Sequence, residues 1–201
     1  MTGFDHDVVI VGSGFGGSVA AIGFDAHVAE RTNRLRWPRG RARYYLALLI
    51  ELARLKPTAF ELGLDGAAPR PAPGTLIAVG STRSYGGGMP VCPDADPTDG
   101  MLDVTHVGPL GRAKLVRLFP LLLRGTHVTR PEVTVSRVAT VDVDAPGLIV
   151  YADGERVGTG RASIRVVPGA LTVLVPGGET TDRSAGETSE PAAGSGPEAS
   201  A

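Results

Sequence analysis

The chain has 201 residues, of which 42% are hydrophobic and 20% charged, a composition typical of a globular protein with its own core. A formal net charge of −1 excludes the strongly basic surface of most nucleic-acid-binding proteins, so we expect no nucleic-acid partner. A single cysteine excludes an internal disulfide, and no basic signal-like start or long apolar run is present, so we expect a cytoplasmic protein.

The first predicted element is a strand over residues 7–11, which leads into three glycines at Gly12, Gly14 and Gly17. Glycines with this spacing let a strand turn tightly into a helix, and they let backbone N–H groups approach a pyrophosphate. We therefore assign Gly12, Gly14 and Gly17 as candidate cofactor-binding residues.

The continuation of this motif is cut short. A dinucleotide-binding unit needs a full helix and then a second strand that ends in an acid. Residues 18–22 begin in a helix-like way, but Gly23 interrupts them, and the polar segment that follows contains no strand-like run. The sequence therefore predicts a truncated Rossmann-like strand and turn over residues 1–22.

The rest of the chain alternates between a few helical stretches and many short strands. Leucines at helical spacing predict a helix after Pro38, and residues 109–123 predict a second one that is bent or broken at Pro120. Strands are predicted at 60–66, 75–80, 102–107, 133–144, 147–152, 162–167 and 171–175. The pattern predicts an α+β fold, mostly an antiparallel β-sandwich with a few helices, over residues 23–176. The polar tail, residues 177–201, is predicted to be disordered.

An acidic loop, residues 93–103, carries four aspartates. Carboxylates this dense repel one another unless a cation or an arginine neutralises them, and hard oxygen ligands suit Mg²⁺ or Ca²⁺. The loop is not an EF-hand, because the twelfth position counted from Asp94 is Thr105, where a glutamate is required. The spacing leaves two interpretations open, a cation site and an acidic surface turn.

A predicted hairpin over residues 150–158 turns at Asp153 and Gly154. Asp153 and Glu155 flank the turn glycine, so their carboxylates lie close together. Such a pair can raise one pKa and supply a general base. A solvated hairpin tip is the alternative interpretation.

Two further segments also have two interpretations each. Residues 81–88 combine Ser81, Thr82 and Arg83 with three glycines, which suits either a phosphate contact or a plain glycine-rich turn. Residues 104–131 contain five basic residues and no acid, which suits either peripheral contact with an anionic membrane or a helix with a solvated basic face.

The opening residues 5–21, DHDVVIVGSGFGGSVAA, closely resemble the start of flavin-dependent GMC-type oxidoreductases of the cholesterol oxidase group. This resemblance implies FAD as the cofactor. It covers about the first 21 residues, and the second strand, the substrate domain and the catalytic histidine region of that family have no counterpart in the chain. A fragment of a flavin-dependent oxidoreductase is therefore the alternative functional hypothesis.

Residues from about 21 to 176 resemble the C-terminal domain of bacterial diacylglycerol kinase-type, YegS-like lipid kinases. The matching stretches occur in the family's order. They are residues 22–34, 37–57, 79–104, 117–133 and 144–158. The resemblance implies a β-sandwich with a few helices, and the chain as a whole is interpreted as a chimera of the two families.

The lipid kinase resemblance implies roles for both acidic segments. In the loop, Asp99 is expected to offer its side chain to Mg²⁺, and Asp96 and Met101 are expected to offer backbone oxygens. In the hairpin, Glu155 is expected to take the proton from a lipid hydroxyl, with Asp153 beside it.

The same family holds ATP in a separate N-terminal domain with a Gly-Gly-Asp-Gly-Thr motif, which this sequence lacks. Because phosphoryl transfer depends on positioning the nucleotide, we expect no kinase turnover by the chain alone. The implied partner is a lipid substrate, with peripheral contact at the inner membrane face through residues 104–131, and a homodimer is left open.

Overall fold

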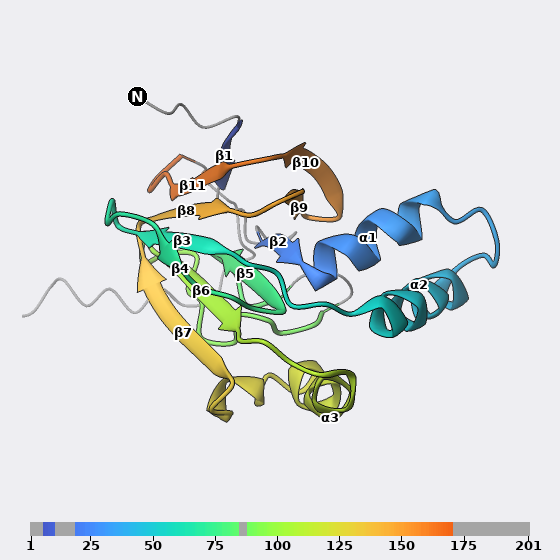
Figure 1. Ribbon diagram of the computed structural model, residues 1–201. Helices are drawn as coiled ribbons and strands as arrows, with labels where there is room; N and C mark the ends of the chain where they lie inside the picture. Colours follow the sequence, from blue (N-terminus) through green and yellow to red (C-terminus); the bar gives the residue numbers. More distant parts are fainter. Residues whose placement is uncertain (1–5, 11–18, 85–87, 171–201) are drawn as a thin grey trace, which may run out of the picture.

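The computed structural model describes residues 6–10, 19–84 and 88–170, which form two β-sheets and three α-helices (Figure 1). Every strand pair of the six-stranded sheet is antiparallel. Its order is β10 (Glu155–Thr159), β9 (Ile149–Ala152), β2 (Val19–Gly23), β5 (Leu76–Gly80), β6 (Leu102–Val107) and β7 (Val133–Val138). The hairpin predicted over residues 150–158 is confirmed as the pair β9 and β10 at one edge of this sheet.

The second sheet has five strands. Its order is β1 (His6–Ile10), β11 (Ala162–Val166), β8 (Thr140–Asp144), β3 (Glu61–Leu64) and β4 (Arg70–Pro71). Only the pairing of β1 with β11 is parallel. The strand predicted at residues 7–11 is therefore an edge strand of the sandwich, shifted by one residue.

The main core lies between the two sheets, because alternate residues of each strand turn toward the other sheet. From the six-stranded sheet, Ile22, Ile77 and Leu102 are fully buried, and from the five-stranded sheet Val143 and Ile164 are. This layer confirms the predicted β-sandwich.

The helices cover the other face of the six-stranded sheet. They are α1 (Phe24–Arg34), α2 (Arg41–Arg54) and α3 (Arg112–Leu123), and a short 3₁₀ turn, His127–Thr129, follows α3. Apolar residues of that sheet face, such as Val107 and Val133, form a second core with Val28, Leu115 and Leu118 of the helices. The fold therefore has three layers, two sheets and one layer of helices. None of the described helices has the length and apolar character that crossing a bilayer requires.

The helix-like start predicted at residues 18–22 was wrong, because Val19–Gly23 form the central strand β2, whose residues are all buried. The boundary placed between residues 22 and 23 therefore falls inside β2. The segment after Gly23 contains no strand, as the sequence indicated, and it forms the helix α1. The single strand predicted at 133–144 is two strands, β7 and β8, which belong to different sheets.

The helix predicted at 109–123 begins at Arg112, and it continues through Pro120 without a break. A proline this close to the C-terminal end removes one hydrogen bond, which the packing of Leu115, Leu118 and Leu122 on the sheet outweighs. The helix predicted after Pro38 is confirmed as α2. The strand predicted at 171–175 and the tail at 177–201 lie outside the described residues.

Candidate functional site

The acidic loop and the Asp153 hairpin lie at the same end of the six-stranded sheet. The register pairs Val19 of β2 with Gly80 of β5, Gly80 with Asp103 of β6, and Asp103 with Arg137 of β7. Asp153 follows β9, whose last residue pairs with β2, and its backbone N–H donates to the carbonyl of Val19 at 3.3 Å. Antiparallel pairing thus brings residues that are far apart in sequence to one edge.

Asp103 and Arg137 form the centre of the acidic part of this edge. Asp103 is 2% exposed, and its Oδ2 lies 3.5 Å from Nε of Arg137. The same guanidinium lies 3.7 Å from Oδ2 of Asp99, and it donates to the carbonyl of Asp94 at 3.0 Å. Burial raises the pKa of the Asp103 carboxyl, and the charge of Arg137 opposes that shift. One arginine therefore ties the loop to the sheet.

Hydrogen bonds inside the loop bring the three predicted metal ligands together. Oδ1 of Asp96 accepts from N–H and Oγ1 of Thr98 at 2.9 and 2.7 Å, and these bonds lower the pKa of Asp96. Oδ1 of Asp99 accepts from N–H of Met101 at 2.8 Å, and N–H of Asp99 donates to the Asp96 carbonyl at 3.4 Å. Asp96, Asp99 and Met101 thus share one tight turn.

The donor set of this turn is compatible with a hard cation, but it is not a cluster of ligating side chains. Within the described ranges, no group of three or more His, Cys, Asp or Glu side chains is arranged to hold a metal ion. Among the described residues, Oδ2 of the buried Asp103 has no hydrogen-bond donor, although Nε of Arg137 lies 3.5 Å away. Four aspartates, Asp94, Asp96, Asp99 and Asp103, share the charges of Arg83 and Arg137, which leaves a formal charge of −2. This excess charge favours a cation bound through carboxylate and backbone oxygens.

The hairpin turns at Asp153 and Gly154, which have φ values of 51° and 86°. Left-handed backbone at both positions is the geometry of a two-residue hairpin turn, and Asp tolerates it better than most residues. Oδ1 of Asp153 accepts from N–H of Val19 at 3.1 Å. Partial burial raises the pKa of the Asp153 carboxyl, and this hydrogen bond opposes the shift. Asp153 is thus fixed to β2.

The base of the hairpin is fixed to α1 through Glu30. The hydroxyl of Tyr151 donates to Glu30, and Nε of Arg156 lies 3.9 Å from the same carboxylate. The bond from Tyr151 is the main cause that lowers the pKa of Glu30. Glu155 lies between these anchors and is exposed, and its carboxylate has no hydrogen-bond partner among the described residues. An exposed carboxylate on a fixed turn is free to meet a substrate.

The structure brings the two acidic segments to one edge without placing them in contact. Strands β2 and β5 separate β9 from β6, so Asp153 and Asp103 are about three strand spacings, or roughly 14 Å, apart. A substrate that meets both segments must therefore span this edge. The three predicted cofactor-binding glycines, Gly12, Gly14 and Gly17, lie outside the described residues, as do residues 85–87 of the predicted phosphate loop.

Arg137 and Glu30 are the parts of this edge that sequence reasoning missed. Arg137 sits in a strand with no neighbouring motif, and its role follows from the register that places it opposite Asp103. Glu30 lies in the polar segment after Gly23, to which the sequence analysis assigned no functional residue. Glu30 stands four residues before Arg34 and forms an ion pair with it. This acid–base spacing favours a helix, so it could have predicted α1.

Comparisons with known proteins agree on this region. Residues 17–175 match the family model described as the YegS C-terminal NAD kinase beta sandwich-like domain. Diacylglycerol kinase of Mycobacterium tuberculosis (strain ATCC 25618 / H37Rv) is 52% identical over 158 residues, which cover 79% of this chain and 51% of that protein. A probable lipid kinase YegS-like of Stenotrophomonas maltophilia is 30% identical over 76% of this chain and 50% of that protein.

The chain spans about half the length of these curated relatives. A solved structure, that of a putative diacylglycerol kinase from Bacillus anthracis str. Sterne, aligns with a TM-score of 0.48 at 18% identity, over 77% of this chain and 54% of that one. Neither the family model nor the two curated relatives named here is described as a flavoprotein. They give no support to the alternative hypothesis of a flavin-dependent oxidoreductase.

Proposed function

The chain belongs to the family of the YegS C-terminal NAD kinase beta sandwich-like domain, and from this premise we propose that it forms the lipid-substrate side of an ATP-dependent lipid kinase. The acceptor is the hydroxyl of a lipid such as diacylglycerol. The proposal is carried by one observation, the single sheet edge that holds both the Asp153–Glu155 hairpin and the acidic loop. The names of the relatives point in the same direction.

In the proposed reaction, Glu155 accepts the proton of the lipid hydroxyl. The hydroxyl oxygen then forms a bond to the γ-phosphorus of ATP, the bond from that phosphorus to the bridging oxygen breaks, and ADP leaves with the electron pair. The products are the phosphorylated lipid, ADP and the proton on Glu155. Asp153, held by the N–H of Val19, and Glu30, held by Tyr151, keep the hairpin in one orientation.

Asp96, Asp99 and Met101 are the residues that would hold Mg²⁺, and a bound Mg²⁺ supplies positive charge that offsets phosphate charge. Arg137 contributes by fixing the loop, because it contacts Asp99, Asp103 and the backbone of Asp94 at once. The nucleotide itself is expected to bind to the part of the relatives that this chain does not match.

A complementation assay tests the proposal. The full chain is mixed with the half of the M. tuberculosis relative that it does not match, and transfer of labelled phosphate to diacylglycerol in mixed micelles is measured. We expect turnover by the mixture and none by either part alone. Glu155→Gln is expected to lower kcat by 10² to 10⁴-fold, roughly the contribution of a general base.

Glu61→Gln is the matched control, because Glu61 is an exposed glutamate on β3 of the other sheet. It should leave kcat unchanged. Full activity of Glu155→Gln would show that Glu155 is not the general base. No turnover by the mixture, or turnover by the chain alone, would contradict the proposal that this chain supplies the lipid-substrate side and the other half of the relative binds the nucleotide.

A further inference from the structure

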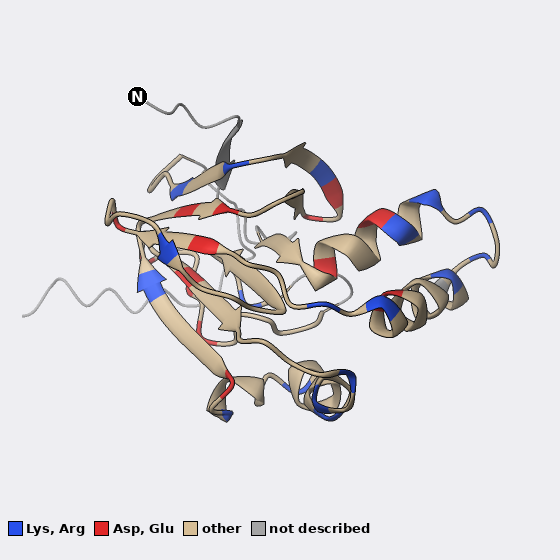
Figure 2. Cartoon of the chain, in the orientation of Figure 1, with Lys and Arg blue, Asp and Glu red and all other residues tan. Residues whose placement is uncertain are grey.

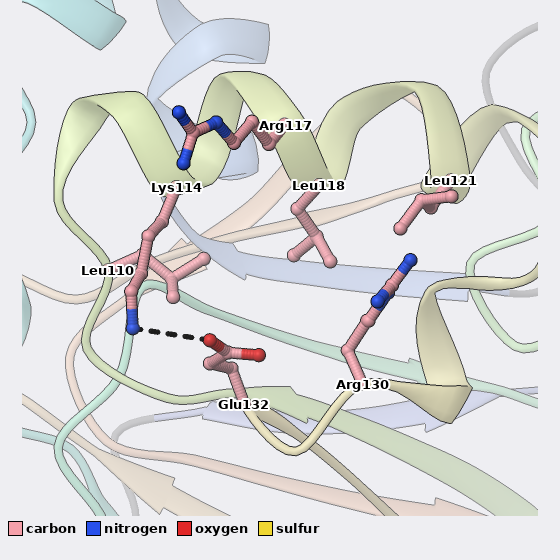
Figure 3. Close-up of a pocket in the computed structure, with 7 residues that line it drawn as sticks. All are labelled: Leu110, Lys114, Arg117, Leu118, Leu121, Arg130 and Glu132. Atoms are coloured by element: carbon pink, nitrogen blue, oxygen red, sulfur yellow. Dashed lines mark hydrogen bonds and ion pairs between the residues drawn. The ribbon is translucent and has the colours of Figure 1, made fainter.

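A pocket of about 310 Å³ lies between helix α3 and the segment that leads from this helix into β7. Its apolar lining is formed by Leu110, Leu118 and Leu121, and charged side chains surround these leucines (Figure 3). Pockets for small molecules span roughly 300–1,000 Å³, so this one is at the lower end of that range. Its volume suits one short hydrocarbon chain better than the two chains of a phospholipid.

The wall of the pocket opposite the helix is held by backbone contacts. N–H of Arg130 donates to the carbonyl of His127 at 3.0 Å, and Nε2 of the fully buried His127 lies 3.1 Å from the carbonyl of Val91. The carbonyl of Arg130 accepts from N–H of Val133 at 3.0 Å. Pro131 restricts the backbone of Arg130 to the extended conformation that it adopts, with φ −89° and ψ 142°. Arg130 is therefore presented by a fixed segment.

The charges around the pocket favour an anion. Among the described residues that line it, Glu132 is the only acid, and Nζ of Lys114 lies 3.2 Å from its Oε1. The side chain of Arg130 points across the pocket toward the leucines of α3 (Figure 3). Neither Arg117 nor Arg130 has an ion pair within the described part of the chain.

This combination of groups defines the chemistry of a ligand. Three cations and one acid leave a formal charge of +2 around the leucines. Guanidinium binds carboxylate and phosphate through paired N–H donors. Each methylene group that leaves water for an apolar lining contributes about fourfold in affinity. The pocket therefore fits a molecule that has an oxyanion at one end and hydrocarbon at the other.

The pocket is remote from the acidic edge. Asp103 lies near the start of β6 and Arg137 near the end of β7, whereas Leu110 follows β6 and Glu132 precedes β7. Val107 stands four residues after Asp103 along β6, a distance of about 13 Å. Figure 2 shows basic segments on α3 and no acidic one, so positive charge is separated from the aspartates. The pocket is thus a separate site from the acidic loop and the Asp153 hairpin.

We propose that this pocket binds a single-chain amphiphilic anion, as a monomer from solution. The hydrocarbon chain packs on Leu110, Leu118 and Leu121. The carboxylate or phosphate group is bound by Arg130, with Arg117 at the rim. Charge complementarity and the small volume together select this occupant. The proposal does not depend on kinase activity.

Isothermal titration calorimetry of the full chain tests the proposal with hexanoate, octanoate, decanoate and dodecanoate, each below its micelle concentration. We expect affinity to rise about fourfold with each methylene and to level off once the chain fills the pocket. Octanol lacks the charge and acetate lacks the chain, so both should bind at least about tenfold more weakly than octanoate. Octyl phosphate, compared with octanoate, identifies the preferred head group.

Two double variants test the role of the pocket arginines. Arg117→Gln/Arg130→Gln should weaken octanoate binding roughly tenfold, since two partly solvated ion pairs are lost. Arg112→Gln/Arg124→Gln is the matched control, because it removes two basic residues of α3 and its C-terminal end that do not line the pocket. It should change the affinity by less than about twofold. Circular dichroism should confirm that both variants are folded.

A larger side chain tests the place of binding without a change of charge. Leu121 is partly buried, and Leu121→Trp should fill the pocket and abolish octanoate binding. Val116→Trp is the control, because Val116 is 53% exposed on the same helix and does not line the pocket.

Four results would overturn the proposal. They are no binding of octanoate or octyl phosphate, affinity that keeps rising with every methylene, equal losses in the two arginine double variants, and unchanged octanoate binding by folded Leu121→Trp.

Discussion

Cys92 lies in the layer between the six-stranded sheet and the helices, where it is 1% exposed. Its Sγ contacts the carbonyl of Asp103 at 3.4 Å, directly behind the acidic edge. Burial raises the pKa of the thiol to about 12. At pH 8, about one molecule in ten thousand then carries the thiolate, which is the reactive form.

We predict that Cys92 in the native chain does not react with Ellman's reagent at pH 8, whereas one thiol per chain reacts after unfolding in guanidinium chloride. The chain has a single cysteine, so the absorbance reports this position alone. Rapid reaction without denaturant would mean that the loop after Cys92 opens readily, and it would contradict the closed packing behind Asp103.

Some residues of the candidate site could be predicted from the sequence. The density of aspartates at 94–103 and the Asp-Gly turn at 153 were visible without coordinates, because both signals are local. The role of Arg137 was not, since it follows from the pairing of β6 with β7. Long-range register is the information that residue types alone do not carry.

At the scale of elements, the junction between β2 and α1 depends on Gly23. Its φ is 85°, and a Cβ at this position would lie 2.8 Å from Cζ of Phe60 and 2.8 Å from the carbonyl oxygen of Thr75. A side chain would therefore be strained by its backbone conformation and would also collide with the core.

We predict that Gly23→Ala lowers the free energy of unfolding by about 2–5 kcal/mol, measured by urea denaturation. Gly147→Ala is the control, because Gly147 also has a positive φ, 69°, but has open space around it. Gly147→Ala should lower the free energy of unfolding by only about 1 kcal/mol, because it adds backbone strain but no steric collision. Equal decreases in the free energy of unfolding of both variants would contradict this prediction, because they would show that Phe60 and Thr75 make room for the new methyl group without a loss of stability.

The strands that the sequence predicted well are those bounded by turn residues. All residues of β5 are buried, but its strand was predicted at 75–80 because Gly74 precedes it and Gly80 ends it. The single strand predicted at 133–144 is two strands, β7 and β8, since alternation alone does not show where the chain passes from one sheet to the other. Strand β2 was missed because its fully buried apolar run has no period that separates a strand from a helix, and the glycine motif before it favoured a helix. Helix α1 was missed because Phe24, Ala26 and Val28 are its only buried residues among many polar ones.

At the scale of the whole molecule, the opening strand is joined to the sandwich at one edge. β1 pairs with β11 alone, and the buried residues Ile164 and Val141 of the neighbouring strands belong to the main core without it. An edge strand of this kind adds backbone hydrogen bonds, and it also covers the free edge of the strand beside it.

We predict that deletion of residues 1–10 lowers Tm by less than about 5 °C and leaves the far-ultraviolet circular dichroism of a folded protein. The uncovered edge of β11 should instead cause association that increases with protein concentration, which size-exclusion chromatography detects. A deletion variant that is unfolded would show that the opening strand is part of the core.

The separation of charge described above gives the molecule a permanent electric dipole moment. Acids gather around Asp99 at one end of β6 and β7, and arginines and a lysine gather on α3 at the other. In the field of any negatively charged surface such a body experiences a torque, and it rotates during approach so that its positive pole leads.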